Sequence, residues 1–153
     1  MAACEVQLVA IQSAERAEFM QIAEEHFRGL SPTFTPHEDW RRSYFETILA
    51  NPKVFLRWIV CNDERAGFIL YGIERHRFLP RTTGAIYELY IDTGKRRRGI
   101  GQQAARIAIR ELQQQGPSKI QLEVVEGNDG AASLWTSLGF KKVTERFVLA
   151  SKI

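Results

Sequence analysis

The stretch that decides the fold reads Glu88-Leu89-Tyr90-Ile91-Asp92-Thr93-Gly94-Lys95-Arg96-Arg97-Arg98-Gly99-Ile100-Gly101-Gln102. Its pattern is that of a strand, a basic loop and the start of a helix. Because glycine lacks a Cβ, the backbone at Gly99 and Gly101 can approach a ligand closely and take positive φ. The following helix offers unpaired N–H groups and a positive dipole end, which favour a phosphate group. The stretch therefore predicts an anion site, although a tight turn with solvated arginines would also fit.

Hydrophobic periodicity on both sides of this stretch predicts alternating strands and helices. The expected strands cover residues 6–11, 54–61, 66–74, 85–91, 119–125 and 141–149. The expected helices cover residues 13–26, 35–50, 100–115 and 128–138, with Thr35 as the N-cap of the second. The resulting order is β-α-α-β-β-β-α-β-α-β, an α/β fold with helices flanking one mixed central β-sheet.

Length and composition bound the class of protein. A chain of 153 residues, 44% hydrophobic and 25% charged, is expected to form a single domain over residues 1–153. Cys4 and Cys61 are expected to be reduced thiols, because two cysteines are too few for a metal site and do not resemble the disulfide framework of a secreted protein. The N-terminus lacks the pattern of a signal peptide, and the apolar stretch 54–61 contains Arg57 and is too short for a bilayer. These features predict a cytoplasmic protein with no membrane partner.

Three segments carry a family resemblance. Arg96, Gly99 and Gly101 occupy the named positions of Q/R-x-x-G-x-G/A, the acetyl-CoA signature of the GNAT superfamily of N-acetyltransferases. Residues 88–92 are similar to that family's E-L-Y-V-D strand, and residues 128–140 to its N-x-x-A-x-x-L-Y-x-x-L-G-F segment. The resemblance is sharp from residue 85 to residue 140 and only topological before that. It implies a GNAT-like fold and transfer of an acetyl group from acetyl-CoA to an amine.

The same resemblance implies which residues contact acetyl-CoA as co-substrate, with no metal. Backbone amides of the loop would hold the pyrophosphate: Arg96, Arg97, Arg98, Gly99, Ile100, Gly101 and Gln102. Backbone groups of Leu89, Tyr90 and Ile91 would pair with the pantetheine arm like an added strand. Asn128 would hydrogen-bond the same arm, and the N–H near Ile91 would polarise the thioester carbonyl.

Trp135 departs from the family pattern, which usually has a tyrosine there whose hydroxyl can protonate the leaving thiolate. The indole N–H is a hydrogen-bond donor but not a usable acid. Another group must be the acid, or the thiolate leaves with solvent help, since a thiol has a pKa of about 8.5. Trp135 is expected either to pack in the core or to line the cofactor site beside the thioester.

Glu88 is the candidate catalytic residue. An alkylammonium has a pKa of about 10.4, so a base must take its proton before the amine can attack. Strand alternation places Glu88 on the face opposite Tyr87 and Leu89, close to the backbone that would hold the pantetheine end. The alternative is a carboxylate that only attracts a cationic acceptor or forms an ion pair.

The acceptor itself is not named by the sequence. Residues 26–35 and 75–84 are expected to border it, and a small-molecule or peptide amine fits. His26, His37 and His76 are expected to be surface or capping residues, because they have neither metal spacing nor a nucleophile partner. Of these, His76 is the one placed to border the acceptor. The family resemblance also favours a homodimer.

Two other classes of protein share part of this pattern. A non-catalytic acyl-CoA-binding sensor or interaction protein would have the same phosphate loop. A nucleic-acid binder could contact phosphates with Lys95 to Arg98, but no aromatic residues are interleaved and no nucleic-acid motif is present. An acetyltransferase without a nucleic-acid partner is therefore the principal hypothesis.

Overall fold

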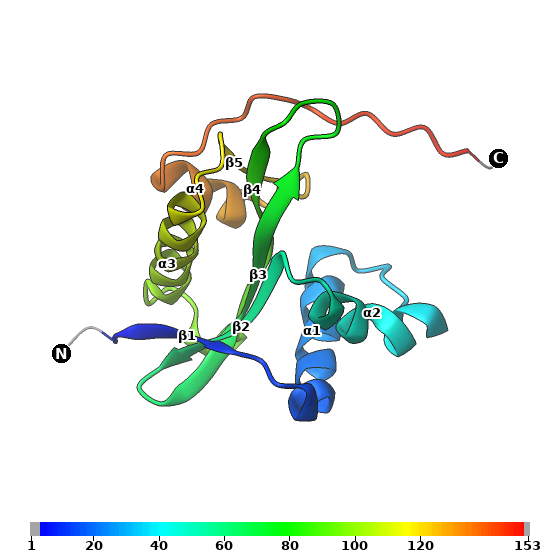
Figure 1. Cartoon of the computed structure of the whole chain (residues 1–153). Coiled ribbons are helices and arrows are strands. Elements are labelled where there is room, and N and C mark those ends of the chain that lie inside the picture. The colour runs from blue at the N-terminus through cyan, green and yellow to red at the C-terminus, as the bar shows by residue number, and fades with distance from the viewer. Residues whose placement is uncertain (1–3, 152–153) are drawn as a thin grey trace.

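The protein is built on a mixed five-stranded sheet. The computed structural model describes residues 4–151. Its strands are β1 (Val6–Ala10), β2 (Val54–Cys61), β3 (Glu64–Arg75), β4 (Thr82–Ile91) and β5 (Ile120–Leu122). They lie in chain order, and neighbouring strands are antiparallel except for β4 and β5, which are parallel (Figure 1).

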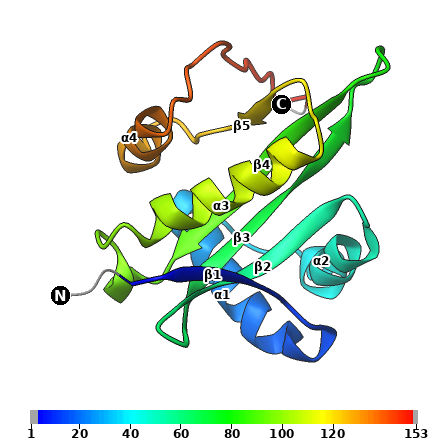
Figure 2. The ribbon, with the colours of Figure 1, turned by 60° about the vertical axis from the view of Figure 1, so that its left-hand side comes forward.

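Helices cover both faces of this sheet. Helices α1 (Arg16–Leu30) and α2 (Glu38–Ala50) lie on one side, and α3 (Ile100–Gln114) and α4 (Asp129–Ser137) lie on the other (Figures 1 and 2). Two short 3-10 helices, η1 (Ser13–Glu15) and η2 (Thr93–Lys95), precede α1 and α3. The predicted α/β fold, with helices flanking one mixed central sheet, is confirmed.

Alternation along β3 separates two hydrophobic cores. Ile69 and Tyr71 belong to the core that includes the buried face of α3, whereas Phe68 and Leu70 belong to the core formed with α1 and α2. All four side chains are at most 6% exposed. Burial of a large apolar side chain contributes about 1.5–3 kcal/mol, so both helical layers are held firmly against the sheet.

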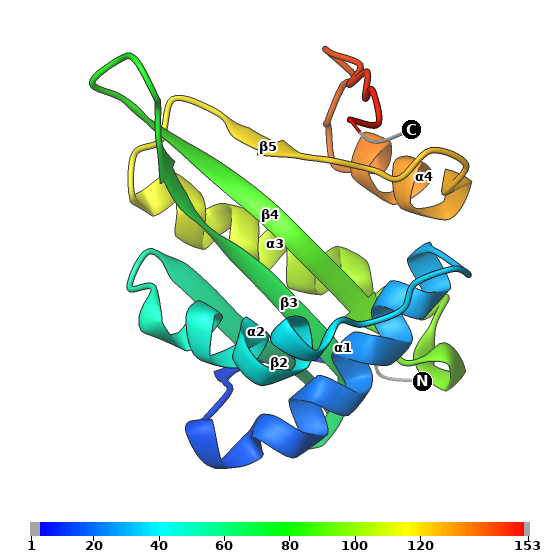
Figure 3. The same ribbon diagram turned by 90° about the vertical axis from the view of Figure 1, so that its right-hand side faces the viewer.

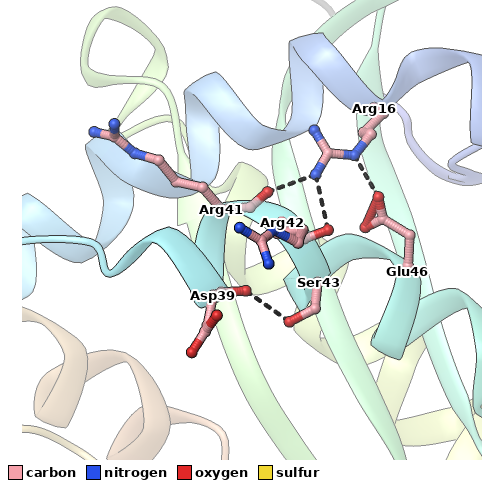
Figure 4. Close-up of polar contacts among 6 residues, drawn as sticks. All are labelled: Arg16, Asp39, Arg41, Arg42, Ser43 and Glu46. Carbon is pink, nitrogen blue, oxygen red and sulfur yellow. Dashed lines mark hydrogen bonds and ion pairs between the residues drawn. The ribbon is translucent and has the colours of Figure 1, made fainter.

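A polar cluster fixes α1 against α2 (Figure 4). The Nε of Arg16 donates to Oε1 of Glu46 at 2.5 Å, and its Nη2 donates to the carbonyl of Arg41 at 2.5 Å. Within α2, the Ser43 hydroxyl donates to the carbonyl of Asp39 at 2.7 Å. This cluster holds α1 and α2 together on one face of the sheet.

A β-bulge interrupts the pairing of β3 with β4. Leu70 opposes Glu88 and Tyr71 opposes Ile86, so Tyr87 is the extra residue. As a result, Ile86 and Leu89 pack in the same core although three positions separate them. The Tyr87 hydroxyl donates to Oε1 of Glu74, which alternation along β3 places on the α1 and α2 face. The expectation that Tyr87 faces away from Glu88 is therefore wrong, because the bulge puts two successive side chains on one face.

The last predicted strand is absent from the described residues. Residues 141–149 form no strand, and β5 is limited to Ile120–Leu122 rather than 119–125. Four apolar side chains of the final segment are between 83% and 92% exposed: Val143, Phe147, Val148 and Leu149. Arg146 forms an ion pair with Glu123, so the segment passes close to the end of β5 without joining the sheet. The prediction of a strand over residues 141–149 is therefore wrong for this structure.

Two local expectations also change. Helix α2 begins at Glu38 with His37 as its N-cap residue, and the Thr35 hydroxyl instead donates to the carbonyl of Thr33. Cys4 and Cys61 lie side by side with a Cα–Cα distance of 5.8 Å, which a disulfide can span, whereas the sequence predicted two unpaired reduced thiols. The reason is the register of β1 on β2, which places Val6 opposite Cys61 and so brings Cys4 near the same strand end.

Candidate active site

The candidate site lies where β4 and β5 separate. Parallel pairing runs only from Gly84 with Ile120 to Ile86 with Leu122, and it ends where the bulge begins. Figure 3 shows the two strands diverging beyond this point. The second half of β4 therefore has one edge with no strand beside it among residues 4–151.

Two residues of β4 direct their backbone groups toward this open edge. The amide of Asp92 donates to the carbonyl of Ala66 at 2.7 Å, which makes that pair a hydrogen-bonded one in the β3–β4 ladder. In an antiparallel ladder such pairs alternate with pairs whose backbone groups point away from the partner strand. Leu89 and Ile91 occupy the alternate positions, so their N–H groups face the side where β5 has departed. Exposed strand-edge groups of this kind are suited to an extended polar chain.

The basic loop adopts left-handed backbone conformations just before α3. Arg97 has φ of 63° and Gly99, the N-cap residue of α3, has φ of 76°. Arg97, Arg98 and Gly99 are exposed, whereas Ile100 is 3% exposed and anchors the first turn of α3 in the core. Successive amides in such a loop, with a helix N-terminus behind them, form a site for an anionic group.

Arg96 differs from its neighbours because the fold uses its side chain. Its Nε donates to the carbonyl of Ile91 at 2.8 Å, and its Cζ lies 5.5 Å from the centre of the Tyr90 ring. The guanidinium thus closes the end of the open β4 edge. Its backbone remains part of the loop, and Gln102 is half-buried in the first turn of α3.

Gly101 is the point at which the three motif segments meet. A Cβ on Gly101 would lie 3.5 Å from Cγ1 of Ile91 and 3.9 Å from Cδ2 of both Leu89 and Leu134. The loop, the open edge of β4 and helix α4 are therefore adjacent in space.

Asn128 and Trp135 both have structural roles in α4. The Asn128 side chain is the N-cap of α4, with Oδ1 accepting from the amide of Ala131 at 3.1 Å. Trp135 is 8% exposed, and its ring centre lies 5.6 Å from that of Phe140. Trp135 packs in the core with α3, as one of the two sequence interpretations stated.

Glu88 points to the other face of β4, toward α1. Its Oε2 lies 2.5 Å from Nε2 of His26, and the two side chains are 21% and 7% exposed. Burial raises the pKa of Tyr44 in α2, and the negative charge of Glu88 raises it further. Tyr44 is therefore a neutral hydroxyl near neutral pH.

His26 was not singled out by the sequence, which predicted a surface or capping residue. It lies on the buried side of α1 with Phe19 and Ala23. The spacing 19, 23, 26 is that of one helix face, so this periodicity was the available signal. The contact with Glu88 could not be predicted in this way, because the sequence of α1 or of β4 alone does not show how the helix packs on the strand.

Two further polar side chains, those of Glu24 and His76, have local partners. Glu24 is paired with Arg28 at 3.1 Å and with Arg41 at 3.0 Å. Nδ1 of His76 accepts from the amides of Phe78 and Leu79, both at 3.1 Å, and so stabilises the turn after β3. These residues are held by the fold, in contrast to the free edge of β4.

Two accessory features are absent from the part of the chain that the structure describes. No group of three or more His, Cys, Asp or Glu side chains within residues 4–151 is placed to hold a metal ion. In the same part of the chain, none of the helices combines the length and the apolar character needed to cross a membrane.

Comparison with known proteins identifies the family of this chain. The profile of the acetyltransferase (GNAT) family matches residues 16–140, and the chain belongs to this family. An uncharacterized N-acetyltransferase of Methanocaldococcus jannaschii is 24% identical over 131 residues. That match covers 82% of this chain but only 56% of the archaeal protein, so the chain spans about half the length of its relative.

Solved structures share the fold over nearly the whole chain. A transcriptional regulator from Bacillus halodurans C-125 aligns with a TM-score of 0.78 at 17% identity, covering 95% of this chain and 99% of that one. An aminoglycoside N-acetyltransferase solved in complex with CoA aligns with a TM-score of 0.73 at 13% identity, covering 99% of this chain and 98% of that one. Identities this low show a common fold, and the site must supply the function.

Proposed function

We propose that this protein transfers the acetyl group of acetyl-CoA to a primary amine by direct attack in a ternary complex. The observation that carries the proposal is the second half of β4. Leu89 and Ile91 direct their N–H groups toward the open edge of this strand, while Glu88 places a carboxylate on the face that α1 covers. A strand with both features can hold an extended thioester and a base within one short segment.

The chain has suitable groups for each part of acetyl-CoA, which as co-substrate supplies an activated acyl carbonyl. The amides from Arg96 to Gln102 would hold the pyrophosphate, because left-handed Arg97 and Gly99 direct the loop toward the start of α3. The backbone of residues 89–91 would pair with the pantetheine arm, and the Ile91 N–H would donate to the acyl oxygen. The side-chain oxygen of Asn128 already caps α4, and its side-chain nitrogen would donate a hydrogen bond to the same arm.

Glu88 is proposed as the base that accepts the amine proton, directly or through one water molecule. Its partial exposure of 21% leaves the carboxylate accessible from the acceptor side. General base catalysis contributes roughly 10² to 10⁴ in rate. Trp135 is buried and lacks an acidic proton, so the thiolate would leave with the help of solvent or of another donor.

A cationic small molecule is the acceptor class best matched to this face of the protein. Glu25, Glu88 and Asp92 are carboxylates on or beside the same region, with the Tyr90 hydroxyl 3.5 Å from Oε2 of Glu25. Glu24 is not available to such a ligand, because it is paired with two arginines. A solved protein with the same fold is named an aminoglycoside N-acetyltransferase, which is consistent with a small-molecule acceptor.

An amine-panel assay with acetyl-CoA and purified protein tests the proposal directly, with CoA release as the readout. Glu88→Gln should lower kcat by about 10² or more near pH 7. The loss should shrink as pH rises, because the amine then deprotonates in solution. Glu74→Gln is the matched control, since Glu74 is a carboxylate on the neighbouring strand that bonds to Tyr87 rather than to His26.

The pattern of the loss separates the alternatives for Glu88. A higher KM for the amine with kcat preserved would mean that Glu88 only attracts the acceptor. Binding of acetyl-CoA without acetylation of any amine would instead support the sensor or interaction protein.

A further inference from the structure

The contact between His26 and Glu88 joins the middle of α1 to the bulge of β4. Nε2 of His26 and Oε2 of Glu88 are 2.5 Å apart. A carboxylate can only accept hydrogen bonds, so Nε2 must carry the hydrogen. Only one of the two carboxylate oxygens is engaged by His26, which leaves Oε1 for another partner.

The imidazole ring is held in place by aromatic neighbours. Its centre lies 5.1 Å from that of Phe27, 5.6 Å from that of Phe68 and 5.6 Å from that of Tyr90. These rings come from α1, β3 and β4, so three elements fix the orientation of His26. A side chain set so firmly can orient a more mobile one that bonds to it.

The second ring nitrogen has a different environment. Nδ1 of His26 makes no hydrogen bond to any of residues 4–151. In the same residues no fully buried side-chain nitrogen or oxygen lacks a partner, so Nδ1 must keep some contact with solvent. Nδ1 is therefore open to solvent, and Nε2 is the ring nitrogen that is committed to Glu88.

We infer that His26 is a positioning residue for the base: it binds Oε2 of Glu88 and thereby holds Oε1 toward the acceptor amine. This inference rests on the acetyl-transfer function proposed above. A glutamate has several rotatable bonds, and without this partner its carboxylate would sample orientations that do not reach the amine. Tyr44 from α2 and Tyr90 from β4 face the pair as neutral hydroxyls, and Glu25 is the nearby carboxylate of α1.

Two substitutions distinguish positioning from packing. His26→Gln places an amide nitrogen near the position of Nε2, whereas His26→Asn places it near Nδ1, away from Glu88. We expect kcat to fall about 10–100-fold for His26→Asn and to stay close to the wild-type value for His26→Gln. KM for acetyl-CoA should not change in either variant, since its proposed contacts on β4 are made by the backbone. Equal activity of the two variants, whether high or low, would overturn the positioning role.

The tautomer of His26 can be measured without any enzyme activity. The chain has only 3 histidines, so long-range ¹H–¹⁵N spectra of the wild type and the His26 variants assign the resonance. We expect the Nε2–H tautomer of His26 to predominate in the wild type. In Glu88→Ala this tautomer should no longer be favoured over the Nδ1–H tautomer. An Nδ1–H tautomer would overturn the inference even in an active enzyme. The expected tautomer in a protein that acetylates no amine would support the hydrogen bond and overturn the transfer reaction.

Discussion

Oδ1 of Asn128 accepts a hydrogen bond from the amide of Ala131 at 3.1 Å, and this contact starts helix α4. The oxygen of this side chain is thus committed to the fold. Its nitrogen is the atom proposed to donate to the pantetheine arm. One residue therefore has a capping role and a binding role on different atoms, and substitutions can separate them.

Asn128→Ser keeps a capping oxygen and removes the amide nitrogen. We expect its melting temperature to stay near that of the wild type, while the Kd for acetyl-CoA rises about 3–10-fold for one lost hydrogen bond. Asn128→Ala should show the same weaker binding and an additional loss of about 1 kcal/mol in stability. Calorimetry and thermal unfolding measure the two effects, and unchanged affinity in the serine variant would exclude the binding role.

Gly99 tests the phosphate site, because its φ of 76° is tolerated by asparagine and aspartate and no atom lies within 4 Å of an added Cβ. Gly99→Asp should weaken acetyl-CoA binding at least about tenfold more than Gly99→Asn, since only the former places a negative charge at the helix N-terminus. Gly116 offers a matched control, with φ of 73° and equally open space at the far end of α3. If Gly116→Asp weakened binding as much, the loop would not be the phosphate site.

Trp135 is expected to matter for stability more than for catalysis. Trp135→Phe removes part of a side chain that is 8% exposed and packs on Phe140, so unfolding should become easier by about 1–2 kcal/mol. The value of kcat should change by no more than a few-fold, because indole is not the acid. A drop of roughly 10³ in kcat with normal acetyl-CoA binding would show a catalytic role.

Glu15 should make stability depend on pH on the acidic side. A hydrogen bond from the Gln12 amide lowers the pKa of Glu15 below its ordinary value of 4.5, with further help from Trp58 and Arg65. A carboxyl whose pKa is lowered by folding stabilises the protein above its ordinary pKa, and this stabilisation is lost as pH falls toward the lowered value. Glu15→Gln should therefore cost about 1–3 kcal/mol at pH 7 and progressively less below pH 4.5. Urea unfolding of the wild type and Glu15→Gln at pH 7 and below pH 4.5 checks this. A difference in unfolding free energy that does not depend on pH would contradict it.

Much of the site was predictable because its motifs are local. The strand, the glycine loop and the capped helix at Asn128 each have their own sequence pattern, and the structure brings them together at Gly101. The bulge at Tyr87 was not predictable, because it depends on how β4 pairs with β3 rather than on either strand alone. This one-residue shift is also why alternation assigned Tyr87 to the wrong face.

Contacts between distant segments account for the other differences. His26 and Glu88 are 62 positions apart, and Cys4 and Cys61 are 57 apart. Neither pair has a spacing that predicts its contact, since each depends on docking or register formed by other residues. The segment 141–149 shows the reverse case, in which apolar and β-branched residues predict a strand that pairs with no other strand among residues 4–151.

That final segment has a practical consequence for handling the protein. Extended chain with exposed apolar side chains is what proteases cut and what chaperones retain, so Phe147 to Leu149 would be an early target of both. Cleavage after Phe140 would leave the acetyl-CoA loop, β4 and α4 on one fragment. The protein's lifetime and its catalytic competence would then be set by different parts of the chain, and a preparation could lose its tail while its site remained whole.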